Sequence, residues 1–521
     1  MSAHSRRTFL RRGLQATPLA ALSGRLAPLR AKKKKSPELN LLFIAVDDLR
    51  PELGCYGNRT IHTPHIDSIA ERGLTFLRSY CQQATSSPSR TSLLTGRRPD
   101  TTEIYNATTH FRRYLPNVVT LPQRFRQQGY LTTAFSKIYH KPQLDDPRSW
   151  SVPPWIPDGF AWGSDENRTF AQRRWDRLRE AGWVSKEAYY YDPSKRQAPA
   201  DGAAGWEMRS WESPDLPDEA LPDGRTAEQA IRALHQIRAK PFFLAVGFLK
   251  PHLPFVAPKK YYDLYPAGTT RTAKNVFPPA YAPPFALHDS AELRAYTDIP
   301  MSGGVSPYKA RELVRGYYAS VSYVDAQIGR LLGALDDLGL RERTVIVLWG
   351  DHGYHLGDHG LWNKYTNFET ATRTPLIVSA PDRRSAGRKT EALTELVDIY
   401  PSLCDICGLE RPDGLEGSSF LPLFKDPDRL WKRAAFSQYP RDIPGAGNGM
   451  GYSMRTDRYR YTEWLVKETG FRARELYDHQ TDPEENSNIA NDPANLSLVN
   501  GLTGMLHEGW RAALPPTDSL V

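Results

Sequence analysis

The sequence contains few cysteines for its length. Four occur in 521 residues, too few for the disulfide framework that is typical of small secreted domains. Cys404 and Cys407 have the C-x-x-C spacing of redox and zinc sites, but a zinc site would need further ligands and no second pair occurs. Both lie in Glu395–Leu409, which has the apolar spacing of a helix. We therefore predict that the cysteines, Cys55 and Cys81 included, are buried thiols.

The body of the chain lacks a charge excess. The formal net charge is +9, but residues 1–36 carry ten lysines and arginines and no acid, and the rest of the chain carries 58 basic and 59 acidic side chains. A nucleic-acid-binding domain would keep its basic excess on the folded part. We therefore expect no nucleic-acid partner.

A long apolar run is also missing from the N-terminal segment. Leu14–Leu22 is too short to cross a membrane, so we expect no stable membrane insertion. It follows Ser5–Leu10, whose sequence Ser-Arg-Arg-Thr-Phe-Leu resembles a bacterial twin-arginine export signal. We predict that residues 1–36 are an export signal with a basic linker and that the protein is periplasmic or secreted. The alternative is a merely basic tail.

The remaining chain alternates strand-like and helix-like segments. Short apolar runs typical of buried parallel strands occur at 40–46, 130–135, 242–248 and 344–349, and helical spacing occurs at 66–72, 121–129, 226–238 and 309–338. This order predicts an α/β fold with a large, mostly parallel sheet between helices. Segments 141–225 and 254–307 are rich in proline and lack periodicity, so we expect functional surface excursions there.

The pattern changes after about residue 426. Short runs at 434–438, 452–455, 459–464 and 475–477 indicate an antiparallel sheet, followed by a terminal helix near 496–510. A chain of 521 residues is too long for one compact core. We therefore predict a catalytic domain at 37–428 and a smaller C-terminal α+β subdomain at 429–521.

Two pairs of polar residues follow predicted strands. Asp47-Asp48 comes after the first strand, and Asp351-His352 comes after the strand at 344–349. Ligand sites of parallel α/β sheets form outside the carboxyl ends of the strands, so the four side chains are expected to meet. Carboxylate oxygens favour calcium or magnesium, whereas a histidine ligand alone favours zinc. Either pair by itself is more often a solvated turn or a helix cap.

Segment 82–97 carries the strongest motif. It reads Ser-Ser-Pro-Ser-Arg at 86–90 and Leu-Thr-Gly-Arg at 94–97, and so resembles the signature of the type I sulfatase family in the alkaline-phosphatase superfamily. The resemblance implies that Ser86 is oxidised to formylglycine. A serine hydroxyl is a poor nucleophile near neutral pH, whereas an aldehyde hydrate offers one hydroxyl to attack sulfur and another to expel sulfate. Arg90, one helical turn later, would steady the diol or sulfate oxygens.

Further blocks resemble the iduronate-2-sulfatase branch of this family. They lie at 136–140, 243–255, 351–365, 437–440 and 450–456, and the resemblance runs from about residue 38 to about residue 490. It implies a sulfuric ester hydrolase that acts on a sulfated saccharide with one calcium ion.

The resemblance also implies site residues. The implied calcium ligands are Asp47, Asp48, the modified Ser86, Asp351 and His352. The implied catalytic residues are Ser86, Arg90, Lys137, His140, His252 and Lys364. Among them His140 would be the base that restores the aldehyde, and His252 the proton donor to the leaving alcohol. Substrate contacts would come from Lys137, His252 and Lys364 and, by position near the motifs, from Tyr354 and Tyr365, with Arg112, Arg113 and Trp362 as further candidates.

One departure from the pattern concerns Ser86, because the animal iduronate enzymes have cysteine there. Bacterial serine-type sulfatases are similar in this respect, so a radical-based, formylglycine-generating maturase is an implied partner. Two alternatives stay open. A phosphomonoesterase or phosphodiesterase of the same superfamily would use Ser86 unmodified, and Asp351-His352 is compatible with it. A non-catalytic carbohydrate-binding protein would never modify Ser86.

Overall fold

The computed structural model describes residues 39–158, 162–165, 167–169, 172, 176, 209–381 and 385–516. The predicted export signal and much of the first predicted excursion lie outside the described residues. Residues 37–521 form one compact unit, which includes both predicted domains. The boundary at 428 therefore stays a prediction.

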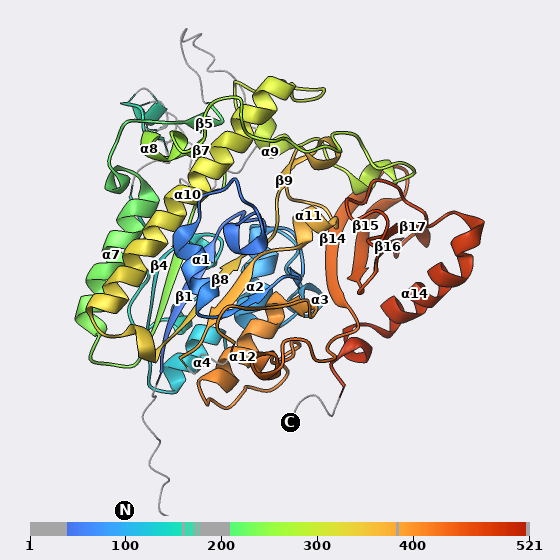
Figure 1. The fold of residues 1–521 in the computed structure, drawn as a ribbon. Helices are drawn as coiled ribbons and strands as arrows, with labels where there is room; N and C mark the ends of the chain where they lie inside the picture. Colours follow the sequence, from blue (N-terminus) through green and yellow to red (C-terminus); the bar gives the residue numbers. More distant parts are fainter. Residues whose placement is uncertain are drawn as a thin grey trace, which may run out of the picture. The chain divides into compact units, whose positions relative to one another are not determined.

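A seven-stranded sheet forms the centre of this unit, in the order β12-β2-β11-β8-β1-β6-β4 (Figure 1). The strands are β1 (Asn40–Val46), β2 (Leu74–Phe76), β4 (Leu131–Ser136), β6 (Phe242–Phe248), β8 (Thr344–Gly350), β11 (Leu376–Ser379) and β12 (Arg388–Thr390). β1 pairs in parallel with both β6 and β8, whereas β11 runs antiparallel to β8 and β2. The prediction of a mostly parallel sheet is thus confirmed.

The sheet is covered on both faces, which explains its continuous apolar strands. Leu42, Ile44 and Val46 of β1 belong to one core, and Leu41 and Phe43 belong to the other. Helices α1 (Pro64–Glu71), α7 (Pro222–Ile237) and α10 (Pro307–Asp337) supply the first core, and α2 (Ser86–Thr95), α4 (Leu121–Gln127) and α12 (Ile399–Ile406) supply the second. Because successive side chains of a strand point to opposite faces of the sheet, alternate residues of β1 pack against different helical layers.

Helices α7 and α12 begin well away from the residues that the sequence predicts. Helix α7 begins at Pro222 instead of Thr226, because proline at the first helical position lacks only an N–H that would be unsatisfied there. Helix α12 begins only at Ile399, since β13 (Thr394–Glu395) pairs with β3 (Ser79–Tyr80) before it. At Thr394–Glu395, pairing with a strand far away in the sequence therefore prevails over the helical spacing of the apolar residues.

All four cysteines are free. Cys81 and Cys404 are buried, as predicted, whereas Cys55 and Cys407 are only half-buried. The prediction of buried thiols is therefore correct for two of the four. Cys55 and Cys407 each pack against the margin of a core cluster, and Cys407 stands at the C-terminal cap of α12.

The predicted C-terminal antiparallel sheet is confirmed. It consists of β14 (Ala435–Ile443), β15 (Gly447–Arg455), β16 (Tyr459–Val466) and β17 (Phe471–Asp478), and α14 (Leu496–Glu508) follows. Buried Arg460 of β16 joins this sheet to the rest of the unit, because its guanidinium pairs with Glu485 at 2.7 Å and with Glu369 at 2.6 Å.

The second predicted excursion contains short elements, namely β7 (Phe255–Val256), α8 (Lys259–Tyr262) and α9 (Ala291–Arg294). In the part of the chain that the structure describes, no helix combines the length and apolar character that crossing a membrane requires.

Candidate active site

The two predicted polar pairs meet at one edge of the central sheet. β1 and β8 are in parallel register, with Val46 opposite Gly350, so the residues that follow them emerge side by side. The backbone N–H of Asp48 donates to Asp351 Oδ1 at 3.1 Å. Asp47, Asp48, Asp351 and His352 are fully buried, so these are not solvated turns. The expectation that the pairs converge is confirmed.

Ser86 joins this cluster as the first residue of helix α2. Its Oγ lies 3.2 Å from Asp47 Oδ1 and 3.2 Å from His352 Nε2. Because the N–H groups of the first helical turn have no partners within the helix, this end of α2 favours a negatively charged group. The predicted nucleophile thus stands between the metal-ligand candidates and a helix N-terminus.

Arg90 lies one turn further along α2 and is fully buried. Its guanidinium donates to Asp351 Oδ2 at 2.9 Å, to Asp47 Oδ1 at 3.0 Å and to the carbonyl of Lys137 at 2.6 Å. Burial lowers the pKa of Arg90, but Asp351 and Asp47 outweigh burial and raise it above its usual value. Arg90 therefore holds the two carboxylates in position. Its donors are engaged with them and with the backbone, and not directed at a site for the diol or sulfate oxygens as predicted.

Lys137 and His140 follow strand β4, next to β6. Lys137 Nζ donates to Asp47 Oδ2 at 2.5 Å. This approach depends on Gly247 of β6, where a Cβ atom would lie 2.1 Å from the Lys137 carbonyl oxygen. Burial, helped by the charge of Lys137, holds the pKa of His140 well below its usual value. The His140 imidazole is thus neutral and suited to accept a proton.

Lys364 and His252 come from distant loops and meet at Glu292. Lys364 Nζ lies 3.0 Å from Asp48 Oδ2 and 3.0 Å from Glu292 Oε2, and His252 Nε2 lies 2.9 Å from Glu292 Oε1. Burial raises the pKa of Glu292, but Lys364 and His252 outweigh it and hold the pKa well below its usual range.

Glu292 was not predicted from the sequence. It belongs to α9, a helix of a single turn within a proline-rich segment. So short a helix has no detectable periodicity, and no sequence motif includes Glu292. A lone glutamate in such a segment is most often a solvated residue. Only its burial, with 7% of its surface exposed, distinguishes it.

The two predicted tyrosines have different surroundings. Tyr365 is half-buried and its hydroxyl donates to Glu292 Oε2 at 2.7 Å, so it belongs to the cluster. Tyr354 is completely buried, its ring stacks on Tyr317, and its hydroxyl accepts a hydrogen bond from Asn363. The structure therefore gives Tyr354 a packing role and does not bring it to a substrate surface, because the ring fills the core behind Asp48.

Of the three further candidates for the sugar site, none is brought to the cluster by a direct contact. Trp362 is buried in the hydrophobic core, and Arg112 pairs with Asp146 at 2.7 Å. Arg113 is exposed on a short 3₁₀ turn.

The donor set fits a divalent metal ion. Ligand atoms of Asp48, Asp351 and His352 lie within 4.8 Å of one another. His352 Nδ1 lies 2.9 Å from the Gly353 carbonyl, which places the proton there and turns the Nε2 lone pair toward the carboxylates. The abundance of carboxylate oxygens favours a hard cation such as calcium.

The charges of the cluster point the same way. With the histidines not counted, its ion pairs join four carboxylates, Asp47, Asp48, Asp351 and Glu292, to three cations, Arg90, Lys137 and Lys364. Burial raises the pKa of Asp48 above its usual value, although the nearby Lys364 lowers it. The positive charge around this carboxylate is therefore too small to offset the effect of burial. A divalent cation would turn one excess negative charge into one excess positive charge, which suits a singly charged anionic ester.

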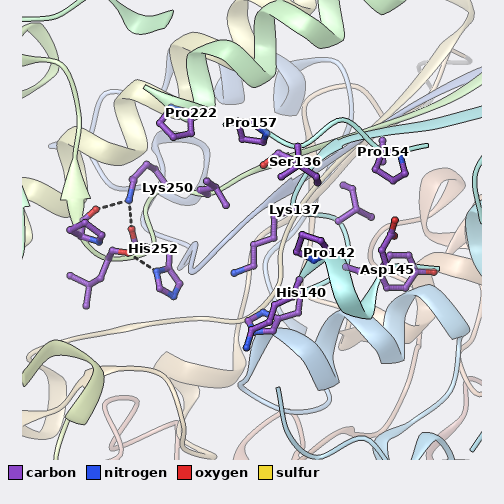
Figure 2. A pocket seen from close by; sticks show the side chains of 18 residues that line it. Ser136, Lys137, His140, Pro142, Asp145, Pro154, Pro157, Pro222, Lys250 and His252 are labelled. Carbon is purple, nitrogen blue, oxygen red and sulfur yellow. Dashed lines mark hydrogen bonds between the residues drawn. The ribbon is translucent and has the colours of Figure 1, made fainter. Parts of the chain in front are cut away.

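A cavity of about 120 Å³ opens beside the cluster (Figure 2). Lys137, His140 and His252 line one side, and their side chains turn toward one another in this view. Its other walls include Pro142, Pro154, Pro157 and Pro222. Lys250 Nζ donates to the carbonyls of His252 and Pro254, at 2.8 and 2.6 Å, which fixes the loop that carries His252.

Comparison with known proteins agrees with this geometry. The sulfatase family model matches residues 39–409, and the model of the N-sulphoglucosamine sulphohydrolase C-terminal region matches residues 357–511. Iduronate 2-sulfatase of Mus musculus is 35% identical over 540 residues, which cover 89% of this chain and 93% of the mouse protein.

Two solved structures share the fold. A phosphonate monoester hydrolase of Agrobacterium radiobacter has a TM-score of 0.70 and 23% identity, covering 91% of this chain and 95% of its own. A structure in complex with its substrate, D-glucosamine-2-N,6-O-disulfate, has a TM-score of 0.68 and 20% identity, covering 90% of this chain and 97% of its own. Because the family model spans the whole sheet and every residue of the buried cluster, the chain belongs to the sulfatase family and is a sulfuric ester hydrolase.

Proposed function

We propose that this sulfatase removes sulfate from a sulfated carbohydrate, in the manner of an iduronate 2-sulfatase, with formylglycine derived from Ser86 as the nucleophile. The observation that carries the proposal is the position of Ser86 Oγ, 3.2 Å from both Asp47 and His352 at the start of a buried helix. Support for the substrate class comes from the names of the relatives, iduronate 2-sulfatase and the disulfated glucosamine complex.

The proposed modification converts the Ser86 CH₂OH group to an aldehyde by loss of two hydrogen atoms to a radical maturase. Water then adds to the aldehyde and gives a carbon with two hydroxyl groups. One hydroxyl oxygen attacks sulfur, and the sulfur–oxygen bond to the sugar breaks. The second hydroxyl then loses its proton, the aldehyde re-forms, and sulfate departs. A plain serine ester of sulfate has no second hydroxyl and would be hard to cleave.

The surrounding side chains have distinct proposed roles. His140, neutral because it is buried next to Lys137, would take the proton of the second hydroxyl. His252 would protonate the departing sugar oxygen. Lys137 and Lys364, already placed at Asp47 and Asp48, would contact sulfate oxygens. The cavity beside His140 and His252 would receive part of the saccharide.

One calcium ion completes the proposal. The residues that would hold it are Asp47, Asp48, the modified Ser86, Asp351 and His352. When bound, it would supply positive charge that favours the deprotonated nucleophile and offsets the charge of the sulfate group.

A second candidate is a phosphomonoesterase or phosphodiesterase that uses Ser86 unmodified. The contact between Ser86 Oγ and His352 Nε2 favours it, because an imidazole at that distance can accept the serine proton. The four cationic or imidazole side chains at 137, 140, 252 and 364 do not discriminate between sulfate and phosphate.

Mass spectrometry of the Ser86 peptide separates the two candidates. Protein from a host with a serine-type maturase should give a peptide lighter by two hydrogen atoms, and should release sulfate from a panel of sulfated mono- and disaccharides. Protein from a host without the maturase is the control and should be inactive. Full activity of unmodified Ser86, with phosphate esters preferred, would establish the second candidate instead.

We also propose that residues 1–36 direct export by the twin-arginine route after modification in the cytoplasm. A fusion of residues 1–36 to a reporter should reach the periplasm, and replacement of Arg6 and Arg7 by lysine should retain it in the cytoplasm.

A further inference from the structure

Glu292 is the one carboxylate of the buried cluster that is not a candidate metal ligand. Both of its oxygens are engaged: Oε1 lies 2.9 Å from His252 Nε2 and 3.1 Å from Lys364 Nζ, and Oε2 accepts from the Tyr365 hydroxyl at 2.7 Å. Its side chain is 8% exposed. A carboxylate with this many charged or polar donors is fixed in position.

The backbone around Glu292 is fixed to the segment that carries Lys364. Ser290 Oγ accepts from the Trp362 N–H at 3.0 Å, and Asn363 Oδ1 accepts from the Leu293 N–H at 3.3 Å. Helix α9 is therefore attached on both sides of Glu292 to the strand that ends next to Lys364. This attachment sets the distance between the carboxylate and the ammonium group.

The two residues that Glu292 holds need such support. Lys364 has a long, flexible side chain whose ammonium group would otherwise have only Asp48 as its carboxylate partner in the cluster. His252 Nδ1 faces the Leu253 carbonyl at 2.7 Å, and the carboxylate fixes the other end of the ring, Nε2. The ring is thus held at both nitrogens, which restricts its rotation. Because Nδ1 faces the Leu253 carbonyl, the proton for the leaving oxygen would be the one on Nε2, which Glu292 would share with the ester and so keep directed at it.

We infer that Glu292 is a positioning residue, which holds the His252 imidazole and the Lys364 ammonium group side by side where the alcohol leaves the sulfate ester. The inference rests on the proposed function, because only there do His252 and Lys364 act on the ester. Glu292 itself forms no bond with the substrate and exchanges no atoms in the reaction.

A positioning role has a signature that a structural role lacks. The proton from His252 matters most for a poor leaving group and little for one that departs readily as an anion. Phenyl sulfate and 4-nitrophenyl sulfate share the aryl ring and the sulfate group, and the nitro group makes the second leaving group much the better one; its effect on binding is followed separately through KM. E292Q keeps the size of the side chain but removes its charge, so it should lower kcat for phenyl sulfate by about 100-fold and for 4-nitrophenyl sulfate by less than about tenfold.

The matched control is D289N. Asp289 is exposed, lies three residues before Glu292, and accepts a hydrogen bond from the Ala291 N–H, which asparagine can also do. D289N should change kcat for both esters by less than about twofold, because an exposed charge contributes little.

Several outcomes would overturn the inference. They are an equal loss of kcat on both esters, no loss on either, or a rise in KM at unchanged kcat, which would make Glu292 a substrate contact. If E292Q does not fold, Y365F is the second variant, because it removes one hydrogen bond from Glu292 without leaving a buried charge unpaired. It should lower kcat for phenyl sulfate more than for 4-nitrophenyl sulfate, but by smaller factors than E292Q. A wild-type enzyme that carries formylglycine but cleaves neither ester nor any sulfated saccharide would instead refute the proposed function.

Discussion

Ser86 Oγ and His352 Nε2 lie 3.2 Å apart although 266 residues separate them in the chain. One residue begins helix α2 and the other follows strand β8, so the contact joins the helical layer to the edge of the sheet. His352 is held by the Gly353 carbonyl through its other nitrogen. The contact therefore joins the candidate nucleophile to a candidate metal ligand whose orientation is already fixed.

Replacing Ser86 by alanine should abolish sulfate release and leave the fold intact. The change removes the hydroxyl group whose oxidation would give the aldehyde, and the methyl group left at Cβ cannot form a hydrate, so we expect a loss of at least about 10³-fold in kcat. The change removes the two contacts of Ser86 Oγ, with Asp47 and His352, and the melting temperature should change by less than about 4 °C. Turnover within a factor of ten of wild type would contradict the proposed nucleophile.

Removing divalent cations should inactivate the protein and lower its melting temperature. The cluster has one more carboxylate than cation, and burial raises the pKa of Asp48. Added calcium at about 100 times its dissociation constant should stabilise the fold by about 2.7 kcal/mol. The check is thermal unfolding and sulfate release after chelation and after return of calcium, magnesium or zinc. Recovery with zinc but not with calcium would contradict the proposed metal.

Substituting Gly247 by alanine should damage the site through the backbone. The new Cβ would lie 2.1 Å from the Lys137 carbonyl oxygen, so strand β4 or the Lys137 segment must move. We expect a loss of activity of about 100-fold, because a displacement of about 1 Å has that effect on a reacting geometry. Gly333 on α10, where a Cβ would have no neighbour within 4 Å, provides the control, and G333A should be close to neutral.

Glu475 should make stability depend on pH. Burial raises the pKa of this carboxyl to about 7, although Tyr477 and Trp464 donate to it. A raised pKa favours the protonated form in the folded state. Its contribution to stability is therefore complete below the unfolded value, 4.5, and is lost as pH rises through about 7.

E475Q removes this titration and tests its sign. The variant should be close to wild type at pH 4.5 and exceed it at pH 8 by about 3 kcal/mol in the free energy of unfolding. Urea unfolding at both values is the measurement. If the difference is larger at the lower pH, the direction of the shift is wrong.

Much of the fold could be predicted from local sequence. Strands β1 and β6 have the predicted bounds, and α10 differs by two residues at most, because a buried parallel strand and a long amphipathic helix leave strong periodic patterns. Strand β11 was not predicted. It is only four residues long and runs antiparallel to β8 and β2, and no local pattern specifies the partner or direction of so short a strand.

The sequence by itself determined the chemistry of the site: the motif at 86–90, and two polar pairs that directly follow apolar strands. Only the tertiary structure decided which side chains surround that chemistry. It placed Tyr354 in the core and brought Glu292 to His252 and Lys364. Residues at strand ends are positioned by hydrogen bonds between neighbouring strands, and the strands themselves can be recognised from the pattern of apolar residues in the sequence. Loop residues such as Glu292 are positioned by contacts between segments far apart in the chain, and a single sequence carries no local signal for those.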